Sequence, residues 1–175
     1  MKTREEIFNI LKQEFPEDVL ELLNQPTEPI IVASPGAIHN ICFYLRDTEG
    51  LQFDSLMVLS GVDDANGEKQ TEEDGSVTIN GGTLSVYYHL ESLSLTQKVT
   101  LKVSTPRDNP EVESVESVWK SANWHEREAY DMFGIKFLHH PDLRRILMPY
   151  DWDAGYPLRK DYKNPEFYQG MKVPY

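Results

Sequence analysis

Val99-Thr100-Leu101-Lys102-Val103 decides the fold, because apolar and polar side chains alternate at every position of this stretch. Strict alternation is typical of a β-strand with one face packed on a core and the other in water. Pro29–Ala33, which is followed by Pro35-Gly36, also has the composition of a strand. Leu56-Met57-Val58-Leu59 is a continuous apolar run, which indicates a strand that is buried.

A β-hairpin is predicted around Asn80-Gly81-Gly82, because Asn and Gly adopt the positive φ values of tight turns. It would join Val77-Thr78-Ile79 to Leu84-Ser85-Val86-Tyr87-Tyr88. The stretch before it, residues 63–76, holds six acidic residues and hardly any apolar one, which predicts a solvated surface loop. Those residues are Asp63, Asp64, Glu68, Glu72, Glu73 and Asp74.

Helices are predicted on both sides of these strands. Thr3 and Glu6 form a capping box, so the first helix should run to about Glu14. We expect a short second helix over Val19–Leu23 and an amphipathic helix over Ala37–Leu45, with Cys42 in its apolar stripe. Val112–Phe133 is predicted to be helical, in one or two pieces, with Gly134 as its stop. The expected fold class is therefore α+β, with helices packed on a mixed or antiparallel sheet.

Composition excludes several classes of protein. The 175 residues predict a single domain. The net charge of −12 disfavours nucleic acid as a partner, because the chain would repel phosphates. No apolar run approaches the roughly 18 residues that cross a bilayer, and the charged first six residues lack the apolar core of a signal peptide. Cys42 is alone, so no disulfide framework or cysteine metal site is expected, and we expect an intracellular, soluble protein.

The chain changes character after Gly134. Residues 1–134 carry 10 basic and 24 acidic side chains, whereas residues 135–175 carry 7 basic and 5 acidic ones. The second segment also holds five of the eleven prolines and eight aromatic residues. The aromatic residues are Phe137, Tyr150, Trp152, Tyr156, Tyr162, Phe167, Tyr168 and Tyr175. Prolines prevent a long helix or a central strand here, and the segment is too aromatic for a solvated linker. We therefore expect a body, 1–134, and an extended tail, 135–175, that binds either a partner or its own domain.

Two catalytic alternatives find weak support. His125-Glu126-Arg127-Glu128 lacks the second His of a zinc helix, since Ala129 stands in its place, and the adjacent His139 and His140 should point opposite ways. Glu128 and Asp131 share one helix face and, with His140, could serve a carboxylate or metal hydrolase. An ion pair between Arg127 and Asp131 explains the same charges.

Two pairs of cations lie in apolar surroundings. Arg144-Arg145 is flanked by Leu143 and Ile146-Leu147-Met148, and Arg159-Lys160 follows Pro157-Leu158. Charges in such a setting are expected to be partly buried and paired, with one Arg of a pair pointing inward and one outward.

Three motifs resemble the 30 kDa subunit family of respiratory complex I, which in bacteria is the C subunit of NADH-quinone oxidoreductase. They are Glu126-Arg127-Glu128-Ala129-Tyr130-Asp131-Met132-Phe133-Gly134-Ile135, His140-Pro141-Asp142-Leu143-Arg144-Arg145-Ile146-Leu147 and Tyr156-Pro157-Leu158-Arg159-Lys160-Asp161-Tyr162. Trp119 and Ala122-Asn123-Trp124 extend the similarity backward. One position departs, since the family usually has a small or amide side chain where this chain has His139.

The resemblance implies a subunit without a redox group of its own, in a complex that carries FMN, iron–sulfur clusters and quinone. It implies a place in the peripheral arm, on the cytoplasmic side of the bacterial membrane, with the tail along the 49 kDa-type (D) subunit and near the cluster-bearing B subunit. The implied role is assembly and positioning in electron transfer from NADH to quinone, with no catalytic site on this chain. A related subunit of a membrane-bound hydrogenase or dehydrogenase is the nearest alternative.

We expect a structural anchor and a partner interface from these residues. The anchor consists of Glu126, Arg127, Glu128 and Asp131. The interface consists of Arg144, Arg145, Trp152, Tyr156, Arg159, Lys160, Asp161 and Tyr162.

Overall fold

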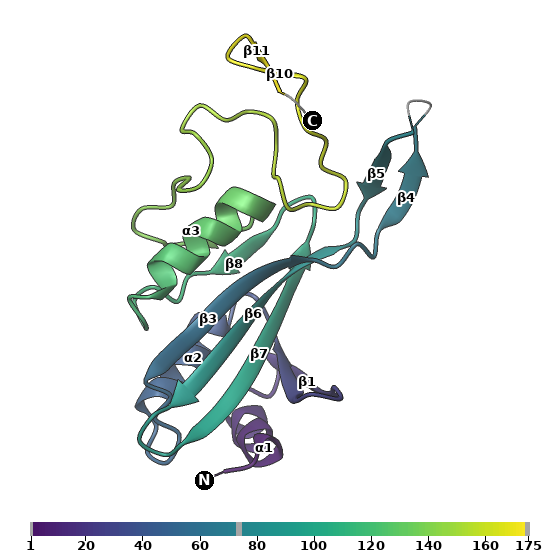
Figure 1. Cartoon of the computed structure of the whole chain (residues 1–175). Helices are drawn as coiled ribbons and strands as arrows, with labels where there is room; N and C mark the ends of the chain where they lie inside the picture. The colour runs from purple at the N-terminus through teal and green to yellow at the C-terminus, as the bar shows by residue number, and fades with distance from the viewer. Residues whose placement is uncertain (1, 73–74, 174–175) are drawn as a thin grey trace.

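The alternating stretch lies within β7 (Gln97–Pro106), an inner strand of a five-stranded sheet in the order β1-β2-β7-β6-β3 (Figure 1). β2 and β7 are parallel and the other neighbours are antiparallel, so the sheet is mixed as expected. This computed structural model describes residues 2–72 and 75–173. Glu73 and Asp74 of the predicted acidic loop, and Pro174 and Tyr175 of the tail, lie outside the described residues.

Three helices and eleven strands make up the described part of the chain. The helices are α1 (Arg4–Glu14), α2 (Ile38–Asp47) and α3 (Ala122–Phe133). The other strands of the large sheet are β1 (Val19–Asn24), β2 (Pro29–Ala33), β3 (Ser55–Asp63) and β6 (Thr83–Ser92). The short strands are β4 (Glu68–Thr71), β5 (Val77–Asn80), β8 (Glu111–Glu113), β9 (Lys136–Leu138), β10 (Phe167–Tyr168) and β11 (Met171–Lys172).

The core forms between the inner face of this sheet and the first two helices. Register pairs Tyr88 with Leu101 and Val86 with Val103, and all four side chains are buried. Ile7 and Leu11 of α1 and Ile38, Ile41, Cys42 and Leu45 of α2 belong to the same cluster. The capping box at Thr3 and Glu6 begins α1 as predicted, and Cys42 is a buried core residue.

Two predictions were wrong for the edge strands of the sheet, β1 and β3. Val19–Leu23 lies in strand β1, where its backbone pairs with β2. A helix this short is unstable, because nucleating a helical turn costs free energy that only a few hydrogen bonds would offset. Pairing with β2 is therefore the more stable arrangement. Leu56–Leu59 lies in β3, but Met57 and Val58 are exposed rather than buried. An irregularity in the β3–β6 register between Leu56 and Val58 accounts for this, since it changes which side chains face the core.

The predicted hairpin was also wrong. β5 pairs with β4, and β6 pairs with β3 and β7. Gly82 serves a close backbone approach instead, because a Cβ at this position would lie 2.5 Å from the nitrogen of Gly67. β4 and β5 form a separate two-stranded arm (Figure 1), and the described part of the predicted acidic loop is only partly loop, since β4 lies within it.

The helix predicted over Val112–Phe133 is shorter than expected. Its first residues form β8, which pairs in parallel with β9, and α3 begins only at Ala122. Ile135 and Phe137 are buried in the core, so the body continues through β9 rather than ending at residue 134. No helix in the two described ranges has the length and hydropathy needed to cross a membrane.

Close packing of α3 on β3 depends on Gly61. A Cβ at Gly61 would lie 2.8 Å from the Phe133 ring and 3.3 Å from the Ala129 Cβ.

We expect Gly61→Val to destabilise the chain by about 1–3 kcal/mol, because α3 must shift away from the strand. Urea unfolding measures this free energy. Gly36→Ala is the matched control, since a Cβ there meets nothing within 4 Å, and an unchanged midpoint for Gly61→Val would contradict the packing described.

Candidate functional site

The residues that resemble the family motifs meet at the C-terminal end of α3. The helix ends at Gly134, whose φ of 77° is left-handed and whose N–H donates to the Tyr130 carbonyl. A Cβ at Gly134 would lie 2.5 Å from the Tyr156 ring. Glycine is therefore required both to end the helix, as predicted, and to let the tail cross it.

Asp131 holds the start of the tail. Its side chain is fully buried, and Oδ2 accepts three consecutive backbone N–H groups, from Ile146 at 3.0 Å, Leu147 at 2.7 Å and Met148 at 2.9 Å. Oδ1 lies 2.7 Å from Nη1 of Arg145. Burial alone would raise the pKa of Asp131, but these hydrogen bonds outweigh it and hold the pKa below its ordinary value.

The two arginines of the first basic pair point in opposite directions, as predicted. Arg145 turns inward to Asp131, whereas Arg144 is exposed and pairs with Asp142. The backbone of Arg144 nevertheless contacts the helix, because its carbonyl accepts from Nε of Arg127. The predicted ion pair between Arg127 and Asp131 is wrong: the guanidinium of Arg127 lies instead over the Trp124 ring, 4.9 Å from its centroid.

The second basic pair closes the end of α3. The last carbonyls of a helix have no partner within it. Here Leu158 N–H donates to the Met132 carbonyl at 3.1 Å, and Nε of Arg159 donates to the Phe133 carbonyl at 2.7 Å. The Tyr156 ring lies near two guanidiniums, those of Arg145 at 5.5 Å and Arg159 at 4.7 Å.

A buried ion cluster ties the tail to the sheet. Arg107, which follows β7, pairs with Asp63 at the end of β3 and with Asp161 of the tail. The Asp63 side chain is fully buried and also accepts the backbone N–H of Lys160 at 2.8 Å. Burial would raise its pKa, but Arg107 and the backbone donors lower it below the ordinary value. The tail is therefore bound at three places on its own body, at Asp131, at the α3 carbonyls and at Arg107.

Glu126 supports the other end of α3. Its buried carboxylate accepts Ser114 Oγ at 2.6 Å and the Val115 N–H at 2.7 Å, which holds the turn after β8. Burial raises the pKa of Glu126 to about 7 despite these hydrogen bonds. His140 Nε2 lies 4.0 Å from the carboxylate. Because His140 Nδ1 accepts the Asp142 N–H, Nε2 carries the ring proton toward the Asn123 carbonyl.

The residues of the hydrolase alternative do not converge. Asp131 and the His140 side chain are buried in different hydrogen-bond sets, and Glu128 is exposed. Within residues 2–72 and 75–173, no three His, Cys, Asp or Glu side chains are grouped so that they could hold a metal ion. His139 points outward to Glu113, opposite to His140, as predicted. Its φ of 65° is left-handed, which explains why small or amide residues suit this position.

The rest of the tail presents apolar side chains outward. Trp152 and Tyr168 pack with ring centroids 5.4 Å apart, and Asp151 accepts from Tyr168 and Gln169, so β10 and β11 are held to the preceding loop. The hairpin lies away from the sheet (Figure 1). Among the described residues that follow β9, five large apolar side chains are exposed, and Tyr150 is 96% exposed. They are Leu147, Tyr150, Leu158, Phe167 and Met171.

The predicted site residues thus divide into two groups. Arg145, Tyr156, Arg159 and Asp161 contact the body of this chain, while Arg144 and Lys160 are exposed and Trp152 and Tyr162 are half-buried. Residue patterns missed Arg107 and Asp63. A lone Arg directly after an alternating strand was the available signal, but the acidic run around Asp63 indicated solvent.

Asp131 provides the sharpest test of how the tail is held. We expect Asp131→Asn to destabilise the chain by about 3–5 kcal/mol. The half-buried Arg145 loses its counter-charge, and the amide nitrogen of Asn cannot accept hydrogen bonds from the backbone N–H groups. Urea unfolding measures the loss, and trypsin should cleave faster after Arg144 or Arg145. Asp153→Asn is the matched control on the exposed surface of the tail. An unchanged cleavage rate for Asp131→Asn would contradict the anchor.

Glu126 should make stability depend on pH. Its folded pKa of about 7 lies above the ordinary 4.5, so the folded state favours the protonated form. Its contribution is complete below pH 4.5 and is lost as the pH rises through 7, a difference of about 3 kcal/mol. Glu126→Gln mimics the protonated form at every pH. The difference in unfolding free energy between this variant and the parent should therefore grow as the pH rises from 4.5 to 7 and stay constant above that. Urea unfolding across this range checks it, and a constant gap would refute the shift.

Comparison with known proteins matches these motifs to one family. A family model described as the 30 kDa subunit of respiratory-chain NADH dehydrogenase matches residues 31–168. The C subunit of NADH-quinone oxidoreductase from Chloroherpeton thalassium is 44% identical over 170 residues, which cover 96% of this chain and 64% of that relative. The corresponding subunit from Chlorobium phaeobacteroides is 42% identical over 170 residues, 96% of this chain and 93% of that relative.

Solved structures share the fold. A trypsin-resistant fragment of Nqo5 is 24% identical with a TM-score of 0.56 and covers 77% of this chain and 97% of the fragment. A chain of the membrane-bound sulfane sulfur reductase, an archaeal respiratory membrane complex, is 19% identical with a TM-score of 0.60 and covers 91% of this chain and 85% of that one. At these identities the structures support the α+β fold alone, whereas the family model and the relatives support the family. The chain therefore belongs to the family of the 30 kDa subunit of respiratory-chain NADH dehydrogenase.

Proposed function

We propose that this chain is a docking subunit of an NADH-quinone oxidoreductase and that its exposed tail surface binds neighbouring subunits. The supporting observation is the set of exposed apolar side chains on residues 147–171, which a segment already bound to its own body has no need to display. Large apolar and aromatic side chains are the usual anchors of protein interfaces.

In this proposal the body and the tail have different tasks. The contacts at Asp131, at the α3 carbonyls and at Arg107 give the tail a fixed path over α3. Residues that remain free of those contacts, such as Tyr150 and Phe167, are then presented in one arrangement before the partner arrives. Presenting an ordered surface lowers the entropic cost of association.

We further propose that the chain carries no catalytic site or redox group and acts through assembly and positioning. FMN, iron–sulfur clusters and quinone would be bound by other subunits of the complex. The 49 kDa-type and cluster-bearing B subunits are the expected neighbours, at the cytoplasmic side of the membrane. Its own polar groups support this role, since the buried carboxylates at Asp131 and Asp63 are engaged by structural donors.

A subunit of a related membrane-bound hydrogenase or dehydrogenase remains the second candidate, because the sulfane sulfur reductase chain shares this fold. The identities of 42–44% to NADH-quinone oxidoreductase subunits favour the first. Mass spectrometry of the complex purified from solubilised membranes distinguishes them, since a flavin-binding NADH subunit and a nickel-site subunit would not occur together.

The hairpin at the end of the tail tests the docking surface. We expect Phe167→Asp with Met171→Asp to reduce recovery of this chain with the complex at least about tenfold, because charges replace interface anchors. Urea stability of the isolated chain should stay unchanged, since both side chains are exposed. Leu93→Asp, at an exposed turn between β6 and β7, is the matched control. Normal recovery of the double variant on a native gel would remove the support for docking through this hairpin.

A further inference from the structure

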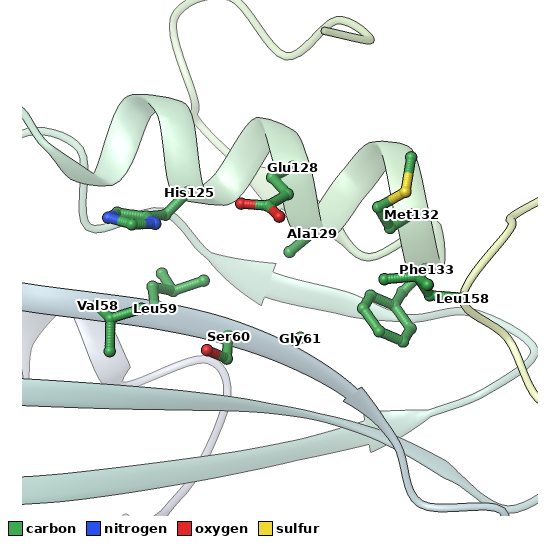
Figure 2. Close-up of a pocket in the computed structure, with 10 residues that line it drawn as sticks. All are labelled: Val58, Leu59, Ser60, Gly61, His125, Glu128, Ala129, Met132, Phe133 and Leu158. Carbon is green, nitrogen blue, oxygen red and sulfur yellow. The ribbon is translucent and has the colours of Figure 1, made fainter. Parts of the chain in front are cut away.

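A groove lies between α3 and the outer strand of the sheet, β3 (Figure 2). Its volume is about 260 Å³, enough for a side chain but too small for a folded element. Apolar side chains from three parts of the chain line it, and Leu158 brings the tail to its edge. The lining residues used below are Val58, Ser60, His125, Glu128, Met132 and Leu158.

Glu128 is the only carboxylate in this lining, and it differs from the other charged residues of its motif. Glu126 binds Ser114, Arg127 binds the Arg144 carbonyl, and Asp131 binds Arg145. Among the described residues, the side chains of Glu128 and His125 have no hydrogen bond or ion pair, although their backbones are bonded within α3. Figure 2 shows both groups on α3, with His125 above Val58 and Leu59 of β3 and Glu128 further along the helix, beside Ala129 and over Ser60.

The shape and charge of the groove indicate which kind of side chain would bind in it. Met57 and Val58 are exposed on the neighbouring edge of β3, and Leu158 is exposed on the tail, so the groove continues into the proposed docking surface. Lys and Arg bury an apolar stem while keeping a charged end, which matches apolar walls beside one carboxylate. Residues 1–134 carry 24 acidic and 10 basic side chains, so the field around the groove also favours a cation.

We infer that the groove receives one basic side chain, a Lys or Arg of a neighbouring subunit, whose charged end pairs with Glu128. Its stem lies against the apolar side chains of the lining nearest Glu128, among them Met132 at the next turn of α3. This inference rests on the proposed docking function, because it assigns the partner chemistry of one part of the same surface. It gives a role to the exposed Glu128, because the other charged side chains of the same motif, Glu126, Arg127 and Asp131, all bind partners within the chain.

Charge reversal tests the pairing. We expect Glu128→Gln to reduce recovery of the chain with the complex several-fold and Glu128→Arg at least about tenfold, because an unpaired or like charge then faces the partner cation. Glu49→Arg is the matched control, since Glu49 is exposed and lies outside the groove. Urea unfolding should show unchanged stability for both Glu128 variants. Recovery of Glu128→Arg equal to that of the parent overturns the inference.

A photo-crosslinking residue in place of Ser60 identifies the occupant in the assembled complex. The crosslinked peptide should come from another subunit and contain a Lys or Arg, and changing that residue to Glu should restore recovery of Glu128→Arg. A crosslink only within this chain, or to a peptide without a basic residue, overturns the inference. If the Phe167/Met171 variant loses assembly while Glu128→Arg keeps it, docking stands and the pairing falls. If both variants assemble normally, both proposals fall.

Discussion

The carboxylate of Asp131 is the constraint on which the arrangement around α3 depends. It is fully buried, and it accepts three successive backbone N–H groups together with a guanidinium. An uncompensated buried charge costs several kcal/mol, on the order of 3–5, so the helix and residues 145–148 must be present together. The path of the tail follows from this one geometric requirement. Leu158 and Arg159 then reach the last carbonyls of the helix, and Arg107 reaches Asp161.

The charged residues of this molecule therefore fall into a buried group and an exposed group, which do different things. The buried groups Asp63, Arg107 and Asp131, with the half-buried Arg145, compensate one another and fix which segments touch. The exposed charges of the acidic body and the mildly basic tail lie at the surface, where other chains can approach them. Apolar residues follow the same division, since Ile135 and Phe137 join the core while Phe167 remains outside.

Local chemistry was predictable from the residues, whereas contacts between distant segments were not. The capping box of α1, the stop at Gly134 and the opposite directions of Arg144 and Arg145 each depend on neighbours within a few positions, and each is present. β1 was mistaken for a helix because its identity depends on pairing with β2. Asp63 was expected in solvent, and Arg127 was expected to pair with Asp131, for the same reason: their actual partners lie on segments that only the folded chain brings together.

The pairing of Asp131 and Asp63 with residues of the tail has a consequence for biosynthesis. A ribosome releases the sheet and α3 before residues 145–161 emerge, and segments generally begin to fold in that order. During this interval Asp131 lacks its donors from residues 145–148, whereas Asp63 already has Arg107 and lacks only the Lys160 N–H. Completion of translation and completion of folding are thereby coupled. Chains that end early, through a nonsense codon or a frameshift, should lack both the closed end of α3 and the tail surface, and should therefore not compete with intact copies for a place in the complex.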